Sequence, residues 1–482
     1  MLVTHSKTPS GVMILAAGLG KRMRSELPKV LHEIGGEPLI FHVLSGVLES
    51  APTAPVCIVV GHGREQVESR VLADPRFAKA DLTFVHQPEQ KGTGHAARCA
   101  MDSQWGSRMT RTQSTVLVLP GDLPLIPASL VQQMFAPLAR NEAVRLLTCE
   151  LTDPTGYGRI VRRGKQGSVL RIVEEKDASA REKLIREVGA SIYSFKAAFL
   201  KAGLQRLSNK NAQGEYYLTD LIAQAARSGK KTDVLRWSHE EDLRGVNDPW
   251  ELAQAGRILN QRCVRASALR GVRFIDPSTT WVDLTVEFDE GVVVHPGAIL
   301  SGSTKIGRGA VIGPRVVLED VEVGAGANVK AGTIAQSSRI GDGAQVGPYA
   351  HLRPESVVGE KAKIGNFVEL KKSVIGDRTS VAHLSYLGDA TVGKDVNIGC
   401  GFVTCNFDGR VIDGQRKHRT VIGDNVFLGS DCQTIAPVRI GDGAYVASGS
   451  TITEDVEPEA LAIARSRQVN KPGYARKLKG KS

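Results

Sequence analysis

The sequence lacks the long apolar runs that mark membrane proteins and secreted precursors. No window of its 482 residues approaches the ~18–20 consecutive apolar residues that a membrane span needs. The first residues, MLVTHSKTPSGV, contain no apolar core of a signal peptide. We therefore expect a cytoplasmic protein with no membrane insertion.

Paired cysteines are also missing. The seven cysteines form no CxxC pair and are scattered over positions 57, 99, 149, 263, 400, 405 and 432. An odd, dispersed set favours free thiols in a reducing compartment over a disulfide framework. The nearest two, Cys400 and Cys405, could be half of a metal site, but no second half-site follows them.

Aromatic residues are scarce and glycine is abundant. Phe, Trp and Tyr make up 5% of the chain, whereas glycine occurs 51 times, which indicates many tight turns rather than thick helical packing. The formal net charge is +11, and the segment from Arg465 to Lys481 carries seven basic residues and no acid. Nucleic acid and phosphate-rich small substrates are both partners that fit this charge, and a solvated tail is the simplest structural interpretation.

Residues 1–249 alternate short apolar runs with amphipathic stretches such as 36–50. The runs are VMILAAG at 12–18, VCIVVG at 56–61 and TVLVLPGD at 115–122. Strand–helix alternation predicts an α/β domain in which helices cover a largely parallel sheet and ligands gather at the carboxyl ends of the strands.

The remaining residues change in character twice. Residues 250–270 predict one linker helix, whose ~20 residues would span about 30 Å. Within the segment 271–482, an aliphatic residue followed by glycine recurs from about residue 291, often at steps of six. That period fits neither an α-helix nor an alternating strand. It predicts a parallel β-helix in which the aliphatic side chain points inward, glycine permits the corner, and three units make one triangular turn.

A globular sheet with glycine-rich turns is the alternative to the β-helix. The repeat breaks once, at CNFDGRVIDGQRKHRT (405–420), where a loop must leave the coil. Interruptions of a rigid solenoid are places where function tends to lie.

The stretch LAAGLGKRMRSELPKVLH, which begins at Leu15, places two glycines before a group of cations. It is not a Walker A motif, because no Ser or Thr follows its lysine, and it lacks the third glycine of a dinucleotide fingerprint. Gly18 and Gly20 let backbone N–H groups approach an anion, and Arg22 and Lys29 can neutralise phosphate charge. An ordinary strand–helix turn with a solvated basic face is the structural alternative.

The pattern L-x-G-x-G-x-R-M followed by L-P-K resembles the sugar-1-phosphate nucleotidylyltransferases. Joined to a hexapeptide β-helix, nearly the whole chain resembles the bifunctional N-acetylglucosamine-1-phosphate uridylyltransferase/glucosamine-1-phosphate acetyltransferase family. The resemblance implies a Rossmann-like mixed-sheet nucleotidyltransferase domain, a left-handed β-helix and a homotrimer. It also implies acetyl transfer from acetyl-CoA to glucosamine-1-phosphate, followed by uridylyl transfer from UTP. The products would be pyrophosphate and UDP-N-acetylglucosamine for the bacterial envelope, with small molecules and no nucleic acid as partners.

By this resemblance, Arg22 and Lys29 are the catalytic cations of the uridylyl site, and Asp122 and Asn247 are ligands of Mg²⁺, a hard ion that prefers oxygen. The nucleotide- and sugar-binding set is Leu15, Ala16, Ala17, Gly18, Lys29, Gln87, Gly92, Thr93, Asp122, Gly158, Glu174, Gly189 and Asn247. The implied reaction is in-line attack on the α-phosphorus without a covalent nucleophile, so positioning and charge neutralisation carry the rate. Pro120 and Gly189 depart from the family's usual Tyr and Asn, and both departures bear on the sugar.

The motifs HLRPES, NFVELKK and HLSYLGD resemble the acetyltransferase signature. By resemblance His383 is the general base, because a neutral imidazole has a suitable pKa to take the proton of the attacking amine. The implied sugar-phosphate contacts are Arg353, Lys371, Tyr386 and Asn397. The implied acetyl-CoA contacts are Cys400, Asn406, Phe407, Ser430, Ser448 and Arg465, with Lys417 as a further contact and the basic tail beside the coenzyme's phosphates.

Two other functions remain open at this point. The chain could be a nucleotidylyltransferase for another sugar-1-phosphate whose β-helix serves mainly in oligomerisation, an interpretation that Gly189 and Pro120 favour and His383 opposes. It could also be a non-catalytic trimeric scaffold, which the retained Lys29 and Asp122 oppose.

Overall fold

The computed structural model describes residues 10–112, 114–164, 167–409, 411 and 414–480. Residues 1–9, for which the sequence predicts no signal peptide, lie outside these ranges. Lys481, the last basic residue of the tail, also lies outside them. The chain divides into two compact units, Met1–Leu259 and Asn260–Ser482. None of the described helices has the length and hydropathy needed to cross a membrane.

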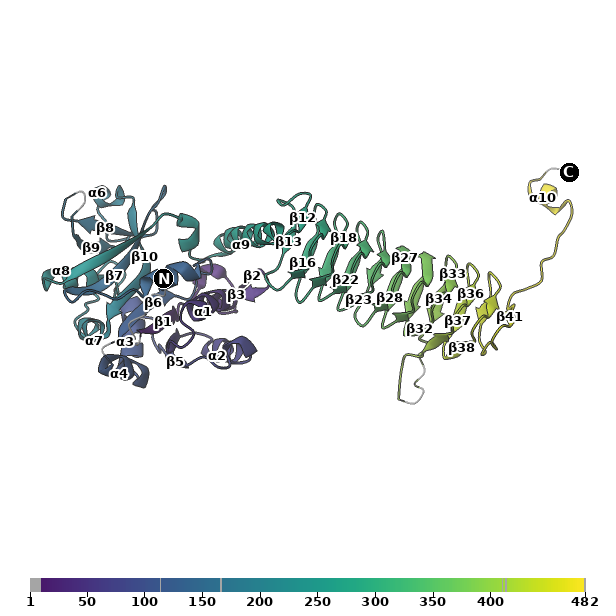
Figure 1. The fold of residues 1–482 in the computed structure, drawn as a ribbon, viewed down its shortest axis with the longest axis horizontal. Coiled ribbons are helices and arrows are strands. Elements are labelled where there is room, and N and C mark those ends of the chain that lie inside the picture. The colour runs from purple at the N-terminus through teal and green to yellow at the C-terminus, as the bar shows by residue number, and fades with distance from the viewer. Residues whose placement is uncertain (1–9, 113, 165–166, 410, 412–413, 481–482) are drawn as a thin grey trace. The chain divides into compact units, whose positions relative to one another are not determined.

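The first unit is built on a mixed sheet, shown in Figure 1. Across the sheet the strands are β11 (Lys231–Trp237), β7 (Glu142–Glu150), β10 (Glu187–Lys196), β6 (Thr115–Pro120), β1 (Ser10–Ala16), β4 (Val56–Val60) and β5 (Leu82–His86), with β8 (Gly158–Arg162) and β9 (Val169–Val173) extending from β10. The strands β6, β1, β4 and β5 are mutually parallel, whereas β10 runs antiparallel to β6, β7 and β8. The predicted strands at 12–18, 56–61 and 115–122 are therefore confirmed, and each ends just before its polar or glycine-containing turn.

The apolar runs form strands that are buried on both faces. In β1, Val12 and Ile14 belong to one core cluster and Met13 belongs to the other. Continuous apolar sequence is expected where helices cover both faces of a sheet. The helices of this unit are α1 (Leu39–Ser50), α2 (Arg64–Leu72) and α5 (Ala128–Met134) with the first cluster, α3 (Thr93–Asp102), α4 (Gln104–Arg111), α7 (Ala197–Leu204) and α8 (Asp220–Arg227) with the second, and α6 (Ala180–Lys183) beside β8.

A long helix, α9 (Pro249–Leu269), begins in the first unit and ends in the second. The side chain of Asn260 on α9 donates to the carbonyl of Thr280 at 2.9 Å and accepts from the amide of Val282 at 2.8 Å. Val264 belongs to the β-helix core. The second half of α9 therefore caps the first coil of the β-helix.

The second unit is a parallel β-helix with three faces, whose short strands stack along its length in Figure 1. One face runs from β12 (Arg273–Phe274) to β41 (Leu461–Ala462), the next from β13 (Trp281–Val282) to β40 (Thr451–Ile452), and the third from β14 (Glu287–Phe288) to β38 (Val438–Ile440). Consecutive strands along the chain belong to consecutive faces, so three six-residue units make one coil, as the repeat predicts. The β-helix begins with β12, before residue 291, where the repeat first becomes visible in the sequence.

The glycine that follows each inward aliphatic residue has a different role from the predicted one. Ile340 is 1% exposed and Val358 is 1% exposed, which confirms that the aliphatic side chain points inward. A Cβ on Gly341 would lie 2.8 Å from the backbone of Gly359, and a Cβ on Gly359 would lie 2.6 Å from the amide nitrogen of Asp377. These glycines are needed because the next coil lies so close. The left-handed corner residue comes two positions later, as at Lys361 with φ 54°.

The predicted interruption lies between β34 (Val403–Cys405) and β35 (Thr420–Ile422). The amide of His418 donates to the carbonyl of Asn406 at 3.0 Å, which brings the two ends of the excursion together. Lys417 Nζ lies 4.2 Å from the centroid of the Phe407 ring, a cation–π contact. The positions of residues 410, 412 and 413 in the predicted loop lie outside the described ranges.

Two candidate active sites

The glycine bend after β1 closes onto the short helical turn η2 (Lys29–Leu31). Gly20 has φ 58°, and a Cβ there would lie 2.9 Å from Cβ of Lys29. Only glycine meets both conditions without strain. A Cβ on Gly18 would meet nothing within 4 Å, so this part of the bend is open to a ligand.

Lys29 joins two distant segments. Its ammonium forms an ion pair with Asp122, in the loop after β6, and donates to Oδ1 of Asn247 at 3.3 Å. The side chains of Lys29 and Asp122 are 14% and 17% exposed. The amide of Val246 donates to the Asp122 carbonyl at 3.0 Å, and Glu251 Oε2 accepts from the amide of Asn247 at 2.6 Å. These bonds fix both oxygen-bearing side chains around the lysine.

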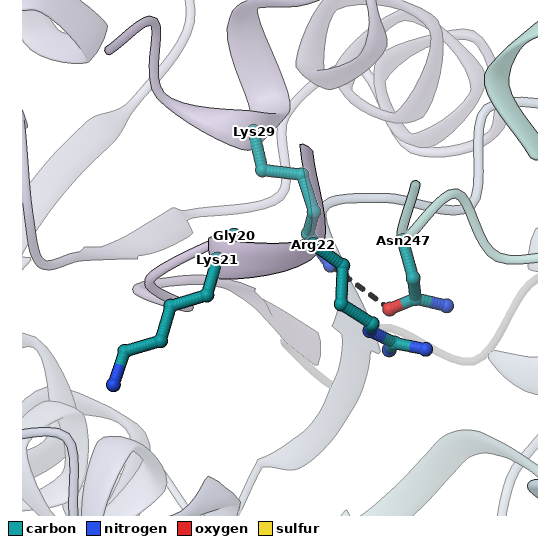
Figure 2. Close-up of a pocket in the computed structure, with 5 residues that line it drawn as sticks. All are labelled: Gly20, Lys21, Arg22, Lys29 and Asn247. Carbon is teal, nitrogen blue, oxygen red and sulfur yellow. Dashed lines mark hydrogen bonds between the residues drawn. The ribbon is translucent and has the colours of Figure 1, made fainter. Parts of the chain in front are cut away.

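A cavity of about 150 Å³ lies at this point, lined by Gly20, Lys21, Arg22, Lys29 and Asn247. Figure 2 shows the Arg22 and Lys29 side chains directed toward Asn247, whereas Lys21 points away. Arg22 is exposed, and among the described residues it makes no ion pair. The cavity therefore contains two cationic side chains beside Asn247, of which Lys29 is paired with Asp122 and Arg22 is not paired within the described residues.

The side-chain oxygens of Asp122 and Asn247 face the same point, because both contact the ammonium group of Lys29. Oxygen atoms are the ligands that a hard cation prefers. Within the described part of the chain, no cluster of three or more His, Cys, Asp or Glu side chains could hold a metal. A protein site with only two oxygen ligands fits Mg²⁺, which keeps water and substrate phosphate in its remaining positions.

The segment predicted to contact uracil lies against residues 215–218. Gly92 has φ 96°, and a Cβ there would lie 2.7 Å from the carbonyl oxygen of Tyr216. Thr93 accepts from the amide of Leu218 at 3.2 Å, and buried Gln87 donates to the Gly92 carbonyl at 3.2 Å. The three predicted residues therefore form one rigid loop at the start of α3, while Leu15, Ala16 and Ala17 lie at and just after the end of β1.

The predicted sugar contacts also meet. Gly158 and Gly189 are partners in the β8–β10 ladder, and a Cβ on Gly158 would lie 3.6 Å from Glu174 Oε2. Burial raises the pKa of Glu174, although the hydroxyl that Thr219 donates to it at 2.8 Å works in the opposite direction. A Cβ on Gly189 would lie 3.3 Å from Cδ1 of Ile172, so a larger residue there would meet the core.

In the second unit, three of the four predicted sugar-phosphate contacts, Arg353, Lys371 and Tyr386, lie on or just after strands of successive coils on one face. The strands are β25 (His351–Leu352), β28 (Glu369–Lys371) and β31 (Tyr386–Gly388). Arg353 follows β25 and pairs with Glu369 at 2.9 Å, and Glu369 lies in register with Tyr386. A Cβ on Gly388 would clash with both the Tyr386 hydroxyl and the Asn406 amide, so these two polar groups converge.

Four of the other predicted residues share one corner of the β-helix, which we call the corner column. It consists of His383, Cys400, Ser430 and Ser448, which the strand registers place at the same position of successive coils. All four are exposed. Exposed Arg465 follows at the next coil, where the amide of Ala464 donates to Ser450 Oγ at 3.2 Å. The strands involved are β30 (Ser380–His383), β33 (Asn397–Ile398), β36 (Phe427–Leu428) and β39 (Tyr445–Val446). Asn397 lies on β33, and exposed Phe407 follows β34.

Sequence reasoning missed two residues that hold predicted ones. Asn366 Oδ1 lies 2.7 Å from Nδ1 of His383, and Asp389 accepts from the Asn406 side chain at 2.6 Å. Both pairs are separated by 17 residues, one coil of the β-helix. Aligning the coils by that period would have revealed both.

Comparison with protein families agrees with the two-part fold. Residues 12–186 match the MobA-like NTP transferase domain, and residues 337–372 and 419–454 match the bacterial transferase hexapeptide (six repeats). Fold and site together define a nucleotidyltransferase joined to a hexapeptide-repeat transferase.

Curated relatives match almost the whole chain. "Bifunctional protein GlmU" of Trichlorobacter lovleyi is 44% identical over 469 residues, which are 97% of this chain and 98% of that protein. The protein of the same name from Streptomyces coelicolor is 44% identical over 474 residues, covering 98% of this chain and 95% of that one. The chain belongs to the GlmU family of bifunctional proteins. It combines acetyltransferase and uridylyltransferase activities, as the motifs imply, which argues against a β-helix that only oligomerises and against a non-catalytic scaffold.

Proposed function

We propose that each unit carries one complete active site and that the two act in sequence. The second unit acetylates glucosamine-1-phosphate from acetyl-CoA, and the first transfers uridylyl from UTP to the resulting N-acetylglucosamine-1-phosphate. The observation that carries this proposal is the convergence of Lys29, Asp122 and Asn247 in one unit and the alignment of His383 with the corner column in the other.

In the uridylyl site, a sugar-1-phosphate oxygen attacks the α-phosphorus of UTP while the bond to pyrophosphate breaks. Arg22 and Lys29 bind the triphosphate and offset the charge that accumulates on its oxygens. Asp122 and Asn247 would hold Mg²⁺, which supplies further charge neutralisation when bound. Gln87, through the loop at the start of α3, positions the uracil.

The sugar lies beside Gly158, Glu174 and Gly189 in this proposal. Because Gly189 has no side chain, the contacts to the sugar beside it come from the backbone and from Glu174. The N-acetyl group is the feature of the substrate that such a site must accept.

In the acetyl site, the amine of glucosamine-1-phosphate attacks the thioester carbon, a C–N bond forms, and coenzyme A leaves as its thiol. His383 accepts the proton that the amine loses. Arg353 and Lys371 bind the sugar phosphate, with Tyr386 and Asn397 on the sugar. The step from His383 to the coil of Arg465 spans four strand spacings of about 4.8 Å, about 19 Å in all, which suits the extended arm of coenzyme A.

The hexapeptide-repeat unit belongs to a fold that oligomerises, and we propose a homotrimer. Three outward side chains of one β-helix face support self-association: Trp281 is 38% exposed, Ile299 44% and Ile334 42%. An exposed apolar stripe of this kind fits a subunit interface. The cytoplasmic location stays a prediction.

Two assays test the proposal. With UTP and Mg²⁺, N-acetylglucosamine-1-phosphate should release pyrophosphate, and Asp122→Asn should abolish this reaction alone. With acetyl-CoA, glucosamine-1-phosphate should release free thiol, and His383→Ala should abolish that reaction alone. Pyrophosphate release with another sugar-1-phosphate only would overturn the substrate assignment.

A further inference from the structure

The imidazole of His383 is held by an asparagine from the preceding coil. Asn366 and His383 are register partners at the ends of β27 (Lys363–Asn366) and β30. Asn366 Oδ1 lies 2.7 Å from His383 Nδ1, and the Asn366 carbonyl accepts from the amide of Leu384 at 3.0 Å. One residue therefore fixes both the ring and the backbone that follows it.

The coils are also closest at this place. A Cβ on Gly365 would lie 1.7 Å from the carbonyl oxygen of Ala382. Glycine at 365 thus lets the two strands continue in register to the corner. The neighbouring strands of this face, β24 (Gln345–Val346) and β33, have two residues each, whereas β27 and β30 have four.

We propose that Asn366 is a positioning residue for acetyl transfer that sets the tautomer and direction of the His383 ring. An amide oxygen can only accept, so the proton lies on Nδ1 and the lone pair on Nε2. His383 is exposed, so Nε2 is open to a substrate amine. The inference rests on the proposed role of His383 as the base.

The choice of an amide matters for the charge of the imidazole. A carboxylate at the same distance would stabilise the imidazolium and raise its pKa, which would leave less neutral base near pH 7. The titratable or charged groups on the packed strands are Lys363 on β27, Glu369 and Lys371 on β28, Tyr386 on β31, Arg353 paired with Glu369, and Cys400 at the next corner position, with none on β33. None of these groups hydrogen-bonds to the ring, so Asn366 is its hydrogen-bond partner within the described residues.

The decisive variant is Asn366→Asp, which keeps an acceptor of the same size. In the pH profile of kcat/KM for acetyl transfer, the acid limb of this variant should move to higher pH by about one unit or more, because an adjacent carboxylate favours the protonated ring. Asn366→Ala should lower kcat about ten- to one-hundred-fold, the scale of losing a partner that orients a functional histidine, with the KM of acetyl-CoA little changed.

Asn328→Asp is the matched control, because Asn328 lies on the same face, on β21 (Asn328–Val329), two coils earlier. Its pH profile should equal that of the unaltered enzyme. Pyrophosphate release by each preparation shows that the first unit is folded, and an unchanged KM for acetyl-CoA shows that the β-helix is folded. An Asn366→Asp profile that superimposes on that of the unaltered enzyme overturns the positioning role. Full acetyl transfer by His383→Ala instead overturns the proposed base itself, so the two failures are distinguishable.

Discussion

Replacing Lys29 with methionine should tighten the binding of Mn²⁺ to the nucleotide-free enzyme. The Lys29 ammonium contacts Asp122 and lies 3.3 Å from Asn247 Oδ1, and these are the oxygens proposed to hold the metal. Two cations cannot use the same oxygens, so a metal must first displace the lysine. In the proposed reaction, the phosphates of bound UTP offer Lys29 a new partner, which frees these oxygens for the metal.

The magnitude follows from the strength of the lysine's hydrogen bonds. A hydrogen bond to a charged group contributes about 1.5–3 kcal/mol. Since 1.4 kcal/mol corresponds to about tenfold in affinity, Lys29→Met should lower the dissociation constant for Mn²⁺ roughly ten- to one-hundred-fold. The affinity for UTP should fall, because the triphosphate loses a cation.

Electron paramagnetic resonance of free Mn²⁺ measures this binding, since Mn²⁺ shares the oxygen preference of Mg²⁺. Lys21→Met is the matched control, because Lys21 lines the same cavity but points away from Asn247 (Figure 2). Asp122→Asn should weaken Mn²⁺ binding. Equal Mn²⁺ affinities of the Lys29→Met and Lys21→Met variants would show that Lys29 does not compete with the metal for these oxygens.

Two further predictions concern the β-helix. Gly359→Ala should destabilise it by about 1–3 kcal/mol in denaturant titrations, because the added Cβ would lie 2.6 Å from the Asp377 amide. Gly343→Asn should cost less, since this corner position tolerates Lys361 one coil later; equal losses would contradict the close-approach argument. Exposed Cys400 should react with a thiol reagent before Cys57, whose pKa burial raises to about 12, and acetyl-CoA should slow labelling of Cys400. Unchanged labelling would remove Cys400 from the coenzyme site.

The sequence predicts the β-helix well because its period is local. Each six-residue unit repeats the same inward aliphatic position, so register and core follow from counting. The reason for the glycine after each aliphatic residue is not local, because a Cβ on Gly359 would clash with Asp377, a residue of the next coil. A single repeat carries no information about how near its neighbour lies.

The mixed part of the first sheet is harder to predict. β10 pairs antiparallel with three strands, and its register shifts between Gly189 and Tyr193, where Ser191 adopts φ 58°. Long-range pairing decides these features, and strand propensity is similar for parallel and antiparallel neighbours. Strand–helix alternation therefore predicts the parallel portion only.

The motifs indicate which residues can bind a ligand, but they do not show which of these residues lie together in the folded chain. Lys29 meets Asp122 and Asn247 across 93 and 218 residues, and only the folded chain shows that one lysine contacts both. Asn366 lies within a quoted motif, yet its contact with His383 depends on the exact stacking of two coils.

The most direct test of two independent sites is complementation by two damaged enzymes. His383→Ala and Asp122→Asn variants, each inactive in the overall conversion of glucosamine-1-phosphate, acetyl-CoA and UTP, are mixed in equal amounts. The mixture should form UDP-N-acetylglucosamine, because the acetylated intermediate diffuses from one variant's intact site to the other's. A mixture that forms no product, although each variant retains its remaining single activity, would contradict the independence of the two sites.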